Sequence, residues 1–408
     1  MSRKGAGVTA AIGFEAAGVR AGIKAGKTNK DMALIYSKEP AVCAGTFTKN
    51  LVKAAPVLWD QNIVNGKGSV QAVVINSGNA NACTGTAGYE NCCLEAEKAA
   101  SLLNITKEQV LICSTGVIGV PLDMDVINKG IDMLVPEKNS SAEAAGDAAE
   151  AILTTDTHKK EIAVTCVIGG KTVTVGGMCK GSGMIHPNMG TMLAFVTSDA
   201  AIAQPVLLDL VREVVEDTFN MVSVDGDTST NDTCLVLCNG MAGNPLLTEK
   251  SEELAIFKAA LFEVLSYLSK QIAGDGEGCT RLFEVTCEGA ASKEEARIIS
   301  KSVVCSSLTK AAVFGKDANW GRILCAMGYS GASFDPEKVD ITLESEEGSL
   351  QIVKAGIATD YSEEFATKIL SGNPVKAFLD VHAGSGKATA WGCDLTYEYV
   401  KINADYRS

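Results

Sequence analysis

The residues Lys180-Gly-Ser-Gly-Met-Ile-His-Pro-Asn-Met-Gly-Thr-Met-Leu-Ala-Phe195 join a polar, glycine-rich loop directly to an apolar strand. The change falls at Gly190-Thr191, and the apolar run continues to Thr197. Just upstream, Glu161 to Val175 forms two β-branched arms around Gly169-Gly170, which is the pattern of a β-hairpin. The stretch therefore predicts a β-hairpin, a loop and a further strand in sequence.

Helical and β-strand patterns alternate along the rest of the chain. Downstream of the loop, Pro205 suits the first turn of a helix that we expect over Val206 to Asn220. A longer helix is expected from the apolar residues at helical spacing that end at Ile272, with Ser251 as its N-cap. In the first 180 residues the short β-like runs are Met32–Tyr36, Ala72–Ile75 and Val110–Cys113, and the helical ones are Tyr89–Leu103 and Ala142–Leu153. We therefore expect a mixed α/β protein, and its 408 residues are enough for about two domains.

The charge and hydropathy of the sequence exclude several classes of partner. Lys and Arg number 36 against 49 Asp and Glu, a formal net charge of −13, so we expect neither a nucleic-acid partner nor binding to an anionic membrane. No apolar run approaches the roughly 20 residues of a membrane-spanning helix. No signal-peptide core follows the N-terminal charges. We therefore expect a cytoplasmic protein.

The cysteine and histidine patterns argue against disulfides and against a metal. The 14 cysteines are scattered through apolar runs such as Cys234-Leu-Val-Leu-Cys238, which indicates buried, reduced thiols. They form no Cys-x-x-Cys pair, and the three histidines, His158, His186 and His382, lie far apart in the chain. The sequence therefore predicts no metal site, although distant ligands can still converge in a fold.

Two loops imitate ligand-binding motifs without having their spacing. Gly22-Ile-Lys-Ala-Gly-Lys-Thr28 resembles a phosphate-binding P-loop, but three residues separate its glycines where that loop needs four. Asp225-Gly-Asp-Thr-Ser-Thr-Asn-Asp232 has the oxygen density of a calcium loop, but it lacks the glycine at the sixth position and the glutamate at the twelfth. We interpret both as turns, the second with side-chain-to-backbone hydrogen bonds.

The Gly190-Thr191 junction has a chemical interpretation besides its place at the start of a strand. If the peptide bond before Thr191 is cut, the new α-amine, with a reference pKa of about 7.7–8.0, can act as the base for the threonine hydroxyl. The same hydroxyl could make the cut by attacking the carbonyl of Gly190, which has no Cβ to obstruct the approach. The alternative is a plain strand start, because Gly and Thr are both common at strand boundaries.

Other residues could complete an acyl-transfer site around such a threonine. In the segment after the strand Val110–Cys113, the Thr115 hydroxyl and the Gly116 N–H could stabilise a developing oxyanion. Lys180 could pair with a substrate carboxylate, and Glu277, isolated among glycines, could hold an ammonium group. Each of these residues also fits an ordinary loop or a solvated surface charge.

Eight motifs occur in order along nearly the whole chain. They are Asn76-Ser-Gly-Asn-Ala-Asn-Ala-Cys-Thr-Gly85, Ser114-Thr-Gly-Val-Ile-Gly119, Thr154-Thr-Asp-Thr157, Gly176-Gly-Met-Cys-Lys-Gly-Ser-Gly-Met-Ile185, Pro187-Asn-Met-Gly-Thr-Met-Leu193, Ser223-Val-Asp-Gly-Asp-Thr-Ser-Thr-Asn-Asp232, Asn319-Trp-Gly-Arg322 and Lys401-Ile-Asn-Ala-Asp-Tyr-Arg-Ser408. Together they resemble the ornithine acetyltransferases of arginine biosynthesis, the bifunctional glutamate N-acetyltransferase/amino-acid acetyltransferase family. The resemblance implies a layered α/β sandwich-like fold, related in layout to N-terminal-nucleophile enzymes. It also implies self-cleavage between Gly190 and Thr191 into an α chain (1–190) and a β chain (191–408), which would assemble as an α2β2 heterotetramer.

The resemblance further implies an activity and a set of site residues. Family members transfer acetyl from N2-acetyl-L-ornithine to L-glutamate by a ping-pong route through an acetyl-threonine, and some also accept acetyl-CoA. No cofactor or metal is implied, with acetyl-CoA as a potential co-substrate. The matching positions here are the nucleophile Thr191, the oxyanion pair Thr115 and Gly116, and the substrate contacts Thr154 (or the adjacent Thr155), Lys180, Thr191, Glu277, Asn403 and Ser408.

Two positions depart from the family pattern. Gly190 replaces the commoner Ala before the cut, and Ser408 stands where Thr is frequent, which keeps a hydroxyl group. Lys180 and Glu277 suit the carboxylate and the cationic δ-amine of acetylornithine. One alternative is an amidase or aminopeptidase of similar layout, in which water accepts the acyl group. A non-catalytic binding protein of the same fold is a second alternative, and the presence of Thr191 argues against it.

Overall fold

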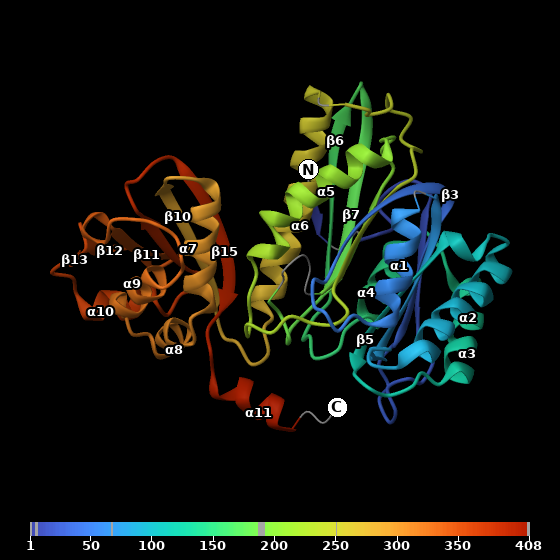
Figure 1. Ribbon diagram of the computed structural model, residues 1–408, viewed down its shortest axis with the longest axis horizontal. Coiled ribbons are helices and arrows are strands. Elements are labelled where there is room, and N and C mark those ends of the chain that lie inside the picture. Colours follow the sequence, from blue (N-terminus) through green and yellow to red (C-terminus); the bar gives the residue numbers. More distant parts are fainter. Residues whose placement is uncertain (1, 5–6, 67, 187–191, 250, 406–408) are drawn as a thin grey trace.

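Two β-sheets organise the chain, and the computed structural model describes residues 2–4, 7–66, 68–186, 192–249 and 251–405 (Figure 1). Within these residues the first sheet has the strand order β1-β6-β7-β8-β9-β3-β4-β5, with β2 paired to β3. Its strands are β1 (Ser2–Lys4), β2 (Phe14–Val19), β3 (Met32–Phe47), β4 (Val70–Asn79), β5 (Val110–Val117), β6 (Lys160–Ile168), β7 (Lys171–Lys180), β8 (Leu193–Ser198) and β9 (Thr233–Cys238). The helices that accompany it are α1 (Ala55–Asn65), α2 (Gly85–Leu103), α3 (Met124–Glu137), α4 (Ala142–Ala151), α5 (Gln204–Glu216) and α6 (Glu252–Gly274).

The second sheet is built from the C-terminal third of the chain and has the order β13-β12-β11-β14-β10-β15. Its strands are β10 (Leu282–Ala290), β11 (Asp340–Ser345), β12 (Gly348–Lys354), β13 (Ile357–Ala358), β14 (Val375–Asp380) and β15 (Gly386–Cys393). The helices of this part are α7 (Lys293–Cys305), α8 (Ser307–Gly315), α9 (Trp320–Gly328), α10 (Glu363–Ile369) and α11 (Tyr397–Asp405). After β15 the chain leaves this sheet, and α11 returns toward the first sheet (Figure 1).

The first sheet folds over on itself because β3 has different partners along its length. Its first part, Met32–Tyr36, pairs with β2 and β4, whereas Val42–Phe47 pairs with β9. The register of the β3–β4 pair shifts between Tyr36 and Ala41, where the strand passes from one layer to the other. Two β-layers therefore face each other, and the apolar side chains packed between them include Ile35, Val73, Ile75, Met178, Phe195, Leu235 and Leu237.

Successive side chains of a strand point to opposite faces, so each of the two β-layers also has an outer face that points away from the other layer. On β4, Val74 packs with the apolar residues of α2 and α3. On β8, Val196 packs with the apolar residues of α5 and α6, in a core that continues into the second sheet. Figure 1 shows α2 and α3 on one side of the strands and α5 and α6 on the other. This helix–sheet–sheet–helix order confirms the predicted layered α/β sandwich.

Local sequence signals predicted several elements correctly. The hairpin of β6 and β7 turns at Gly169 and Gly170, whose φ values of 55° and 75° are those that a tight hairpin turn requires. Pro205 lies in the first turn of α5. Ser251 caps α6, because its hydroxyl oxygen accepts a hydrogen bond from the Leu254 N–H at 3.2 Å.

The two motif-like loops are turns that brace other segments. The segment 22–28 connects β2 to β3, and its Lys24 ammonium donates to the carbonyl of Leu153 at 2.7 Å. In the other loop, the Asp225 carboxylate accepts from the N–H groups of Met184 and Ile185 at 2.7 and 2.9 Å. Both predicted turns are confirmed, and the first holds the backbone beside Thr154, a residue predicted for the site.

Every cysteine lies in the described part of the chain and carries a free thiol. Most are buried or half-buried, as expected, but Cys83 and Cys325 are exposed because they lie on a loop and on an outer helix face. In the described residues, no group of three or more His, Cys, Asp or Glu side chains is arranged to hold a metal ion.

No single helix in the described ranges is long and apolar enough to cross a membrane. The helices α7 and α8 are together long and apolar enough for one span by length and composition only, and they are bent by 59° at their junction.

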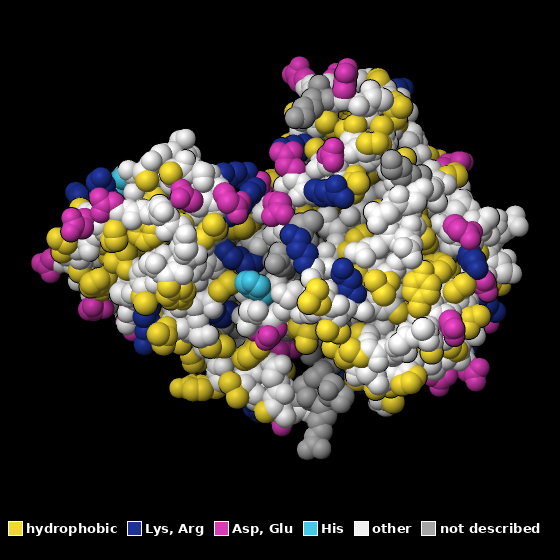
Figure 2. Space-filling view, viewed as in Figure 1, with side chains coloured by type: hydrophobic (Ala, Val, Ile, Leu, Met, Phe, Trp, Pro, Cys, Tyr) yellow, Lys and Arg dark blue, Asp and Glu magenta, His cyan; other side chains and the backbone are white. Residues whose placement is uncertain are grey.

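Acidic and basic side chains are interspersed over the face of the molecule seen in Figure 2, without one large basic patch. In the groove between α6 and the second sheet, lysines are paired with carboxylates: Lys270 with Glu284 at 2.7 Å and Lys376 with Glu344 at 3.0 Å.

Candidate active site

A cavity of about 160 Å³ lies where β5 and β7 end and where β8 and β9 begin. Its volume is below the ~300–1,000 Å³ of pockets for drug-sized ligands, so it suits a small metabolite. The cavity brings together every described residue that the sequence predicts for the site, namely Thr115, Gly116, Thr154, Thr155, Lys180, Glu277 and Asn403. Gly190, Thr191 and Ser408 lie outside the described residues. Met192, which directly follows Thr191 in the chain, lines the cavity.

The end of β5 requires a glycine at position 116. Gly116 has a φ of 136°, and a Cβ there would lie 2.3 Å from the carbonyl carbon of Gly78 and 2.5 Å from the nitrogen of Asn79. The parallel pairing of β4 with β5 becomes irregular at this point. The close contact between the two strands therefore shapes the backbone of Thr115 and Gly116 on the cavity wall.

Lys180 is buried at the end of β7, and its ammonium donates to the Thr115 hydroxyl at 3.4 Å. Burial lowers the pKa of this ammonium, while the nearby Asp156 and Asp232 oppose the shift. A substrate carboxylate placed beside Lys180 would stabilise its charged form. The geometry thus provides a desolvated cation next to the predicted oxyanion pair.

Glu277, which also lines the cavity, joins three segments of the chain. One oxygen of its carboxylate accepts from the Asn403 side-chain amide of α11 at 2.7 Å, and its backbone N–H donates to the Ser182 carbonyl at 3.0 Å. A Cβ on Gly183 would lie 2.4 Å from the Glu277 carboxyl carbon, so this glycine leaves room for the side chain. Asn403 reaches the cavity although α11 itself buries no residue.

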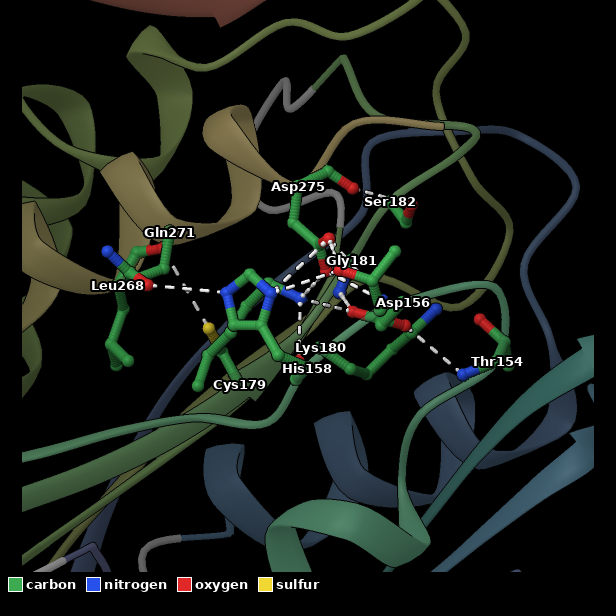
Figure 3. A network of polar contacts seen from close by, with 12 residues as sticks. Thr154, Asp156, His158, Cys179, Lys180, Gly181, Ser182, Leu268, Gln271 and Asp275 are labelled. Carbon is green, nitrogen blue, oxygen red and sulfur yellow. Dashed lines mark hydrogen bonds and ion pairs between the residues drawn. The ribbon is translucent and has the colours of Figure 1, made fainter. Parts of the chain in front are cut away.

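Asp156, which sequence reasoning did not select, is the centre of the polar network in Figure 3. Its carboxylate accepts from the Lys160 ammonium and the Gly181 N–H at 2.7 Å each, and from the Thr154 N–H at 3.1 Å. Burial by itself would raise the pKa of Asp156, but Lys160 and Lys180, together with these hydrogen bonds, lower it to about 2. A charged Asp156 therefore connects the segment of Thr154 to the residue after Lys180.

Asp275 extends the same network to the segment of Glu277. Its carboxylate accepts from the Lys160 ammonium at 2.6 Å and from the Thr157 N–H at 3.0 Å, and Thr157 donates a second hydrogen bond through its hydroxyl. Its backbone carbonyl accepts from the Ser182 hydroxyl at 2.7 Å (Figure 3). Lys160 is fully buried and pairs with both carboxylates. Through these hydrogen bonds and ion pairs, the network connects the three segments that carry Thr154, Lys180 and Glu277.

The sequence held a weak signal for these residues. Asp156 lies inside the Thr154–Thr157 motif, and Asp275 lies two residues before Glu277 in a glycine-rich turn. Neither position reveals that the two carboxylates meet at Lys160, since Asp275 is 115 residues away from it. A similar case is Asn231, whose amide donates to the carbonyl of Ser114 at 2.8 Å and so holds the residue before Thr115.

Comparisons with known proteins agree with the motifs. The sequence profile of the ArgJ family matches residues 15–408. The arginine biosynthesis bifunctional protein ArgJ of Symbiobacterium thermophilum is 52% identical over 403 residues, covering 98% of each chain. ArgJ 1 of Clostridium acetobutylicum is 49% identical over 398 residues, covering 97% of this chain and 96% of that protein. A crystal structure of ArgJ from Bacillus halodurans is 46% identical, with a TM-score of 0.50, and covers 52% of this chain and 98% of that one. The resemblance carried by the eight motifs is thereby confirmed, and the chain belongs to the ArgJ family of bifunctional arginine-biosynthesis proteins.

Proposed function

We propose that this enzyme transfers the acetyl group of N2-acetyl-L-ornithine to L-glutamate through an acetyl ester on Thr191. Family membership makes it an acetyltransferase of arginine biosynthesis. The observation that carries the residue assignments is the convergence of Thr115, Gly116, Lys180 and Glu277 in one small cavity, beside the residue that follows Thr191. These residues come from separate segments, and each matches a position expected from the resemblance.

We also infer that the chain cuts itself between Gly190 and Thr191, giving chains 1–190 and 191–408 that assemble as an α2β2 heterotetramer. Support comes from the crystal structure of ArgJ from Bacillus halodurans. Nearly all of its chain, 98%, matches only 52% of this one, as expected if that chain is one product of such a cut. The cut would fall between β7 and β8, which are antiparallel neighbours paired from Val175↔Ser198 to Lys180↔Leu193. The two chains would therefore stay joined by a β-ladder and a shared core after cleavage. Free thiols throughout the described chain suit a cytoplasmic enzyme.

In the first half-reaction, the Thr191 α-amine takes the proton of the threonine hydroxyl, which attacks the acetyl carbon. The Thr115 hydroxyl and the Gly116 N–H stabilise the oxyanion that forms. The Lys180 ammonium holds the substrate carboxylate, and Glu277 holds the cationic δ-amine. Ornithine leaves, and the acetyl group remains on Thr191.

In the second half-reaction, the α-amine of glutamate attacks the ester and regenerates the free threonine. The same Lys180 ammonium can hold the α-carboxylate of glutamate, because donor and acceptor share an α-amino-acid backbone. Thr154, Asn403 and Ser408 are assigned as further substrate contacts. The proposed reaction needs no cofactor. Acetyl-CoA could act as a second donor by acetylating the same threonine.

The decisive test of acetyl transfer is whether glutamate, and not water, takes the acetyl group. Ornithine release from acetylornithine is expected to stop after about one turnover per site without glutamate, and to continue when glutamate is added. Ornithine and N-acetylglutamate would be quantified by chromatography. Continuous ornithine release at the same rate without glutamate would instead establish an amidase. A parallel assay with acetyl-CoA and glutamate measures the second donor.

Gly116→Ala is expected to reduce kcat by at least about 10²-fold, because the Cβ must displace the β4 backbone at Gly78 and Asn79 and so misplace the oxyanion donors. The matched control is Gly119→Ala. Gly119 also has a positive φ, of 82°, but a Cβ there would meet nothing within 4 Å. Steady-state kinetics of acetyl transfer would give kcat for both variants. An equal loss of kcat in Gly116→Ala and Gly119→Ala would contradict this explanation.

A further inference from the structure

Asp232 is a buried acid that none of the assignments above uses. It immediately precedes β9, lines the cavity and is 2% exposed. Its Oδ2 atom has no hydrogen-bond partner among the described residues. Several other buried side-chain polar atoms in the described part also lack a partner, but Asp232 is the one such residue that lines this cavity. Because an unsatisfied buried polar atom is unfavourable, a ligand in the cavity is the natural partner.

The burial of Asp232 favours the protonated form of its carboxyl group. Burial raises the pKa of Asp232 well above its usual range, although the charge of Lys180 on β7 and hydrogen bonds from Ser229 and Thr48 oppose the shift. Glu277, the other acidic side chain among the described residues that line the cavity, accepts a hydrogen bond from Asn403. On β9 itself, burial raises the pKa of the Cys234 thiol to about 12, so that it remains neutral. Burial therefore favours the neutral O–H form of Asp232, which lies beside the Lys180 ammonium.

The strand pairing places Asp232 next to the start of β8. β8 and β9 are parallel, with Leu193 opposite Thr233, and the Thr233 N–H donates to the Met192 carbonyl at 2.9 Å. Asp232 precedes Thr233 as Met192 precedes Leu193. Thr191 is covalently attached to Met192, so the carboxyl group lies in the part of the cavity where the proposed nucleophile joins the chain.

We propose that Asp232 is a catalytic residue that protonates the departing amine in the first half-reaction and takes a proton from the incoming amine in the second. This inference rests on the acetyl-threonine route proposed above. It adds a proton donor distinct from the Thr191 α-ammonium, which would otherwise pass the proton of the hydroxyl to the departing amine.

The protons balance over one cycle. When the acetyl C–N bond of acetylornithine breaks, the ornithine nitrogen receives the Asp232 proton, and a carboxylate is left beside the Lys180 ammonium. When glutamate attacks the ester, a C–N bond forms and the bond to the Thr191 oxygen breaks. That oxygen regains its proton from the threonine α-ammonium, and the glutamate nitrogen gives its excess proton to the Asp232 carboxylate. The free enzyme is then restored.

The test measures acetylation of the enzyme at saturating acetylornithine, as the pre-steady-state release of ornithine over a range of pH. Saturation removes effects on binding, including loss of the Lys180 charge. In the wild type, the rate is expected to fall as pH rises through the pKa of Asp232, because the acid form is required. A rate that stays constant with rising pH until the protein unfolds would overturn the proposal without any variant.

Asp232→Asn keeps the shape of the side chain and removes its transferable proton. We expect acetylation to slow by about 10²–10⁴-fold and to lose its decline at high pH. Asp232→Glu should restore part of the rate together with that decline, which a purely structural defect would not do. The matched control is Asp227→Asn, an exposed acid in the same loop, which should behave as the wild type.

Two results separate the inference from the function on which it rests. The role of Asp232 is refuted, while acetyl transfer stands, in either of two cases. The first is an acetylation rate of Asp232→Asn within about fivefold of the wild-type rate, and the second is a rate that still declines at high pH in this variant. If the wild type itself shows no glutamate-dependent transfer, the proposed function fails first. Denaturing electrophoresis of each variant shows whether it has matured into two chains before its rate is compared.

Discussion

Thr191→Ala is expected to leave the 42.5 kDa chain uncut and to reduce acetyl transfer by at least about 10⁴-fold. Both effects have the same cause, because the hydroxyl that attacks the Gly190 carbonyl in maturation is the one that accepts the acetyl group in each turnover. Without cleavage there is also no free α-amine to act as the base. Denaturing electrophoresis measures the first effect and ornithine release the second.

Two variants serve as controls for Thr191→Ala. Thr191→Ser retains a hydroxyl and, once cut, an α-amine, so we expect cleavage and measurable activity. Thr172→Ala removes an exposed threonine on β7 and should be cut and active like the wild type. Appearance of two chains from freshly made Thr191→Ala protein would contradict self-cleavage by this residue.

Lys160→Met is expected to lower the free energy of unfolding by about 3–5 kcal/mol, because it leaves the buried carboxylates of Asp156 and Asp275 without their shared cation. The loss should appear as a lower urea midpoint at an unchanged m-value. The Michaelis constants should rise as well, since the network holds the segments of Thr154 and Glu277 in place. Transfer kinetics at several substrate concentrations would measure this second effect.

The adjacent residue supplies a matched control. Lys159 is exposed and lies 3.5 Å from Glu161, so Lys159→Met should cost no more than about 1 kcal/mol. Similar losses for the two variants would show that Lys160 does not stabilise the network through its charge.

The pH dependence of the Lys160 effect follows from Asp156. Its folded pKa of about 2 lies below the unfolded value of about 3.9. The stabilisation from its charged form is therefore complete above the unfolded pKa and is lost as pH falls toward the folded one. The difference in unfolding free energy between the wild type and Lys160→Met should accordingly narrow between about pH 4 and pH 2. If the difference in unfolding free energy stayed constant across this pH range, the stabilisation by Lys160 would not depend on the charge of Asp156.

Those parts of the fold that depend on neighbouring residues could be predicted from the sequence. Gly169-Gly170 predicted a hairpin turn because few residues other than glycine adopt two positive φ values in succession. Pro205 and Ser251 marked helix starts because the unsatisfied N–H groups of a first turn favour a proline or a side-chain acceptor. The layered fold followed from the eight motifs and not from periodicity, which shows the faces of an element but not its partners.

The sequence by itself determined the family and the mixed α/β class, and it predicted the residues of the proposed site, because motif order and residue chemistry are properties of the linear chain. Only the tertiary structure decided that β3 bends between two layers and that Asp156 and Asp275 share Lys160. It also decided that Asp232 has an unsatisfied carboxyl oxygen in the cavity. The physical reason is distance along the chain: Glu277 and Asn403, hydrogen-bonded at 2.7 Å, are 126 residues apart. Burial and charge pairing across such separations arise only when the chain is packed, and they set the protonation states on which the chemistry depends.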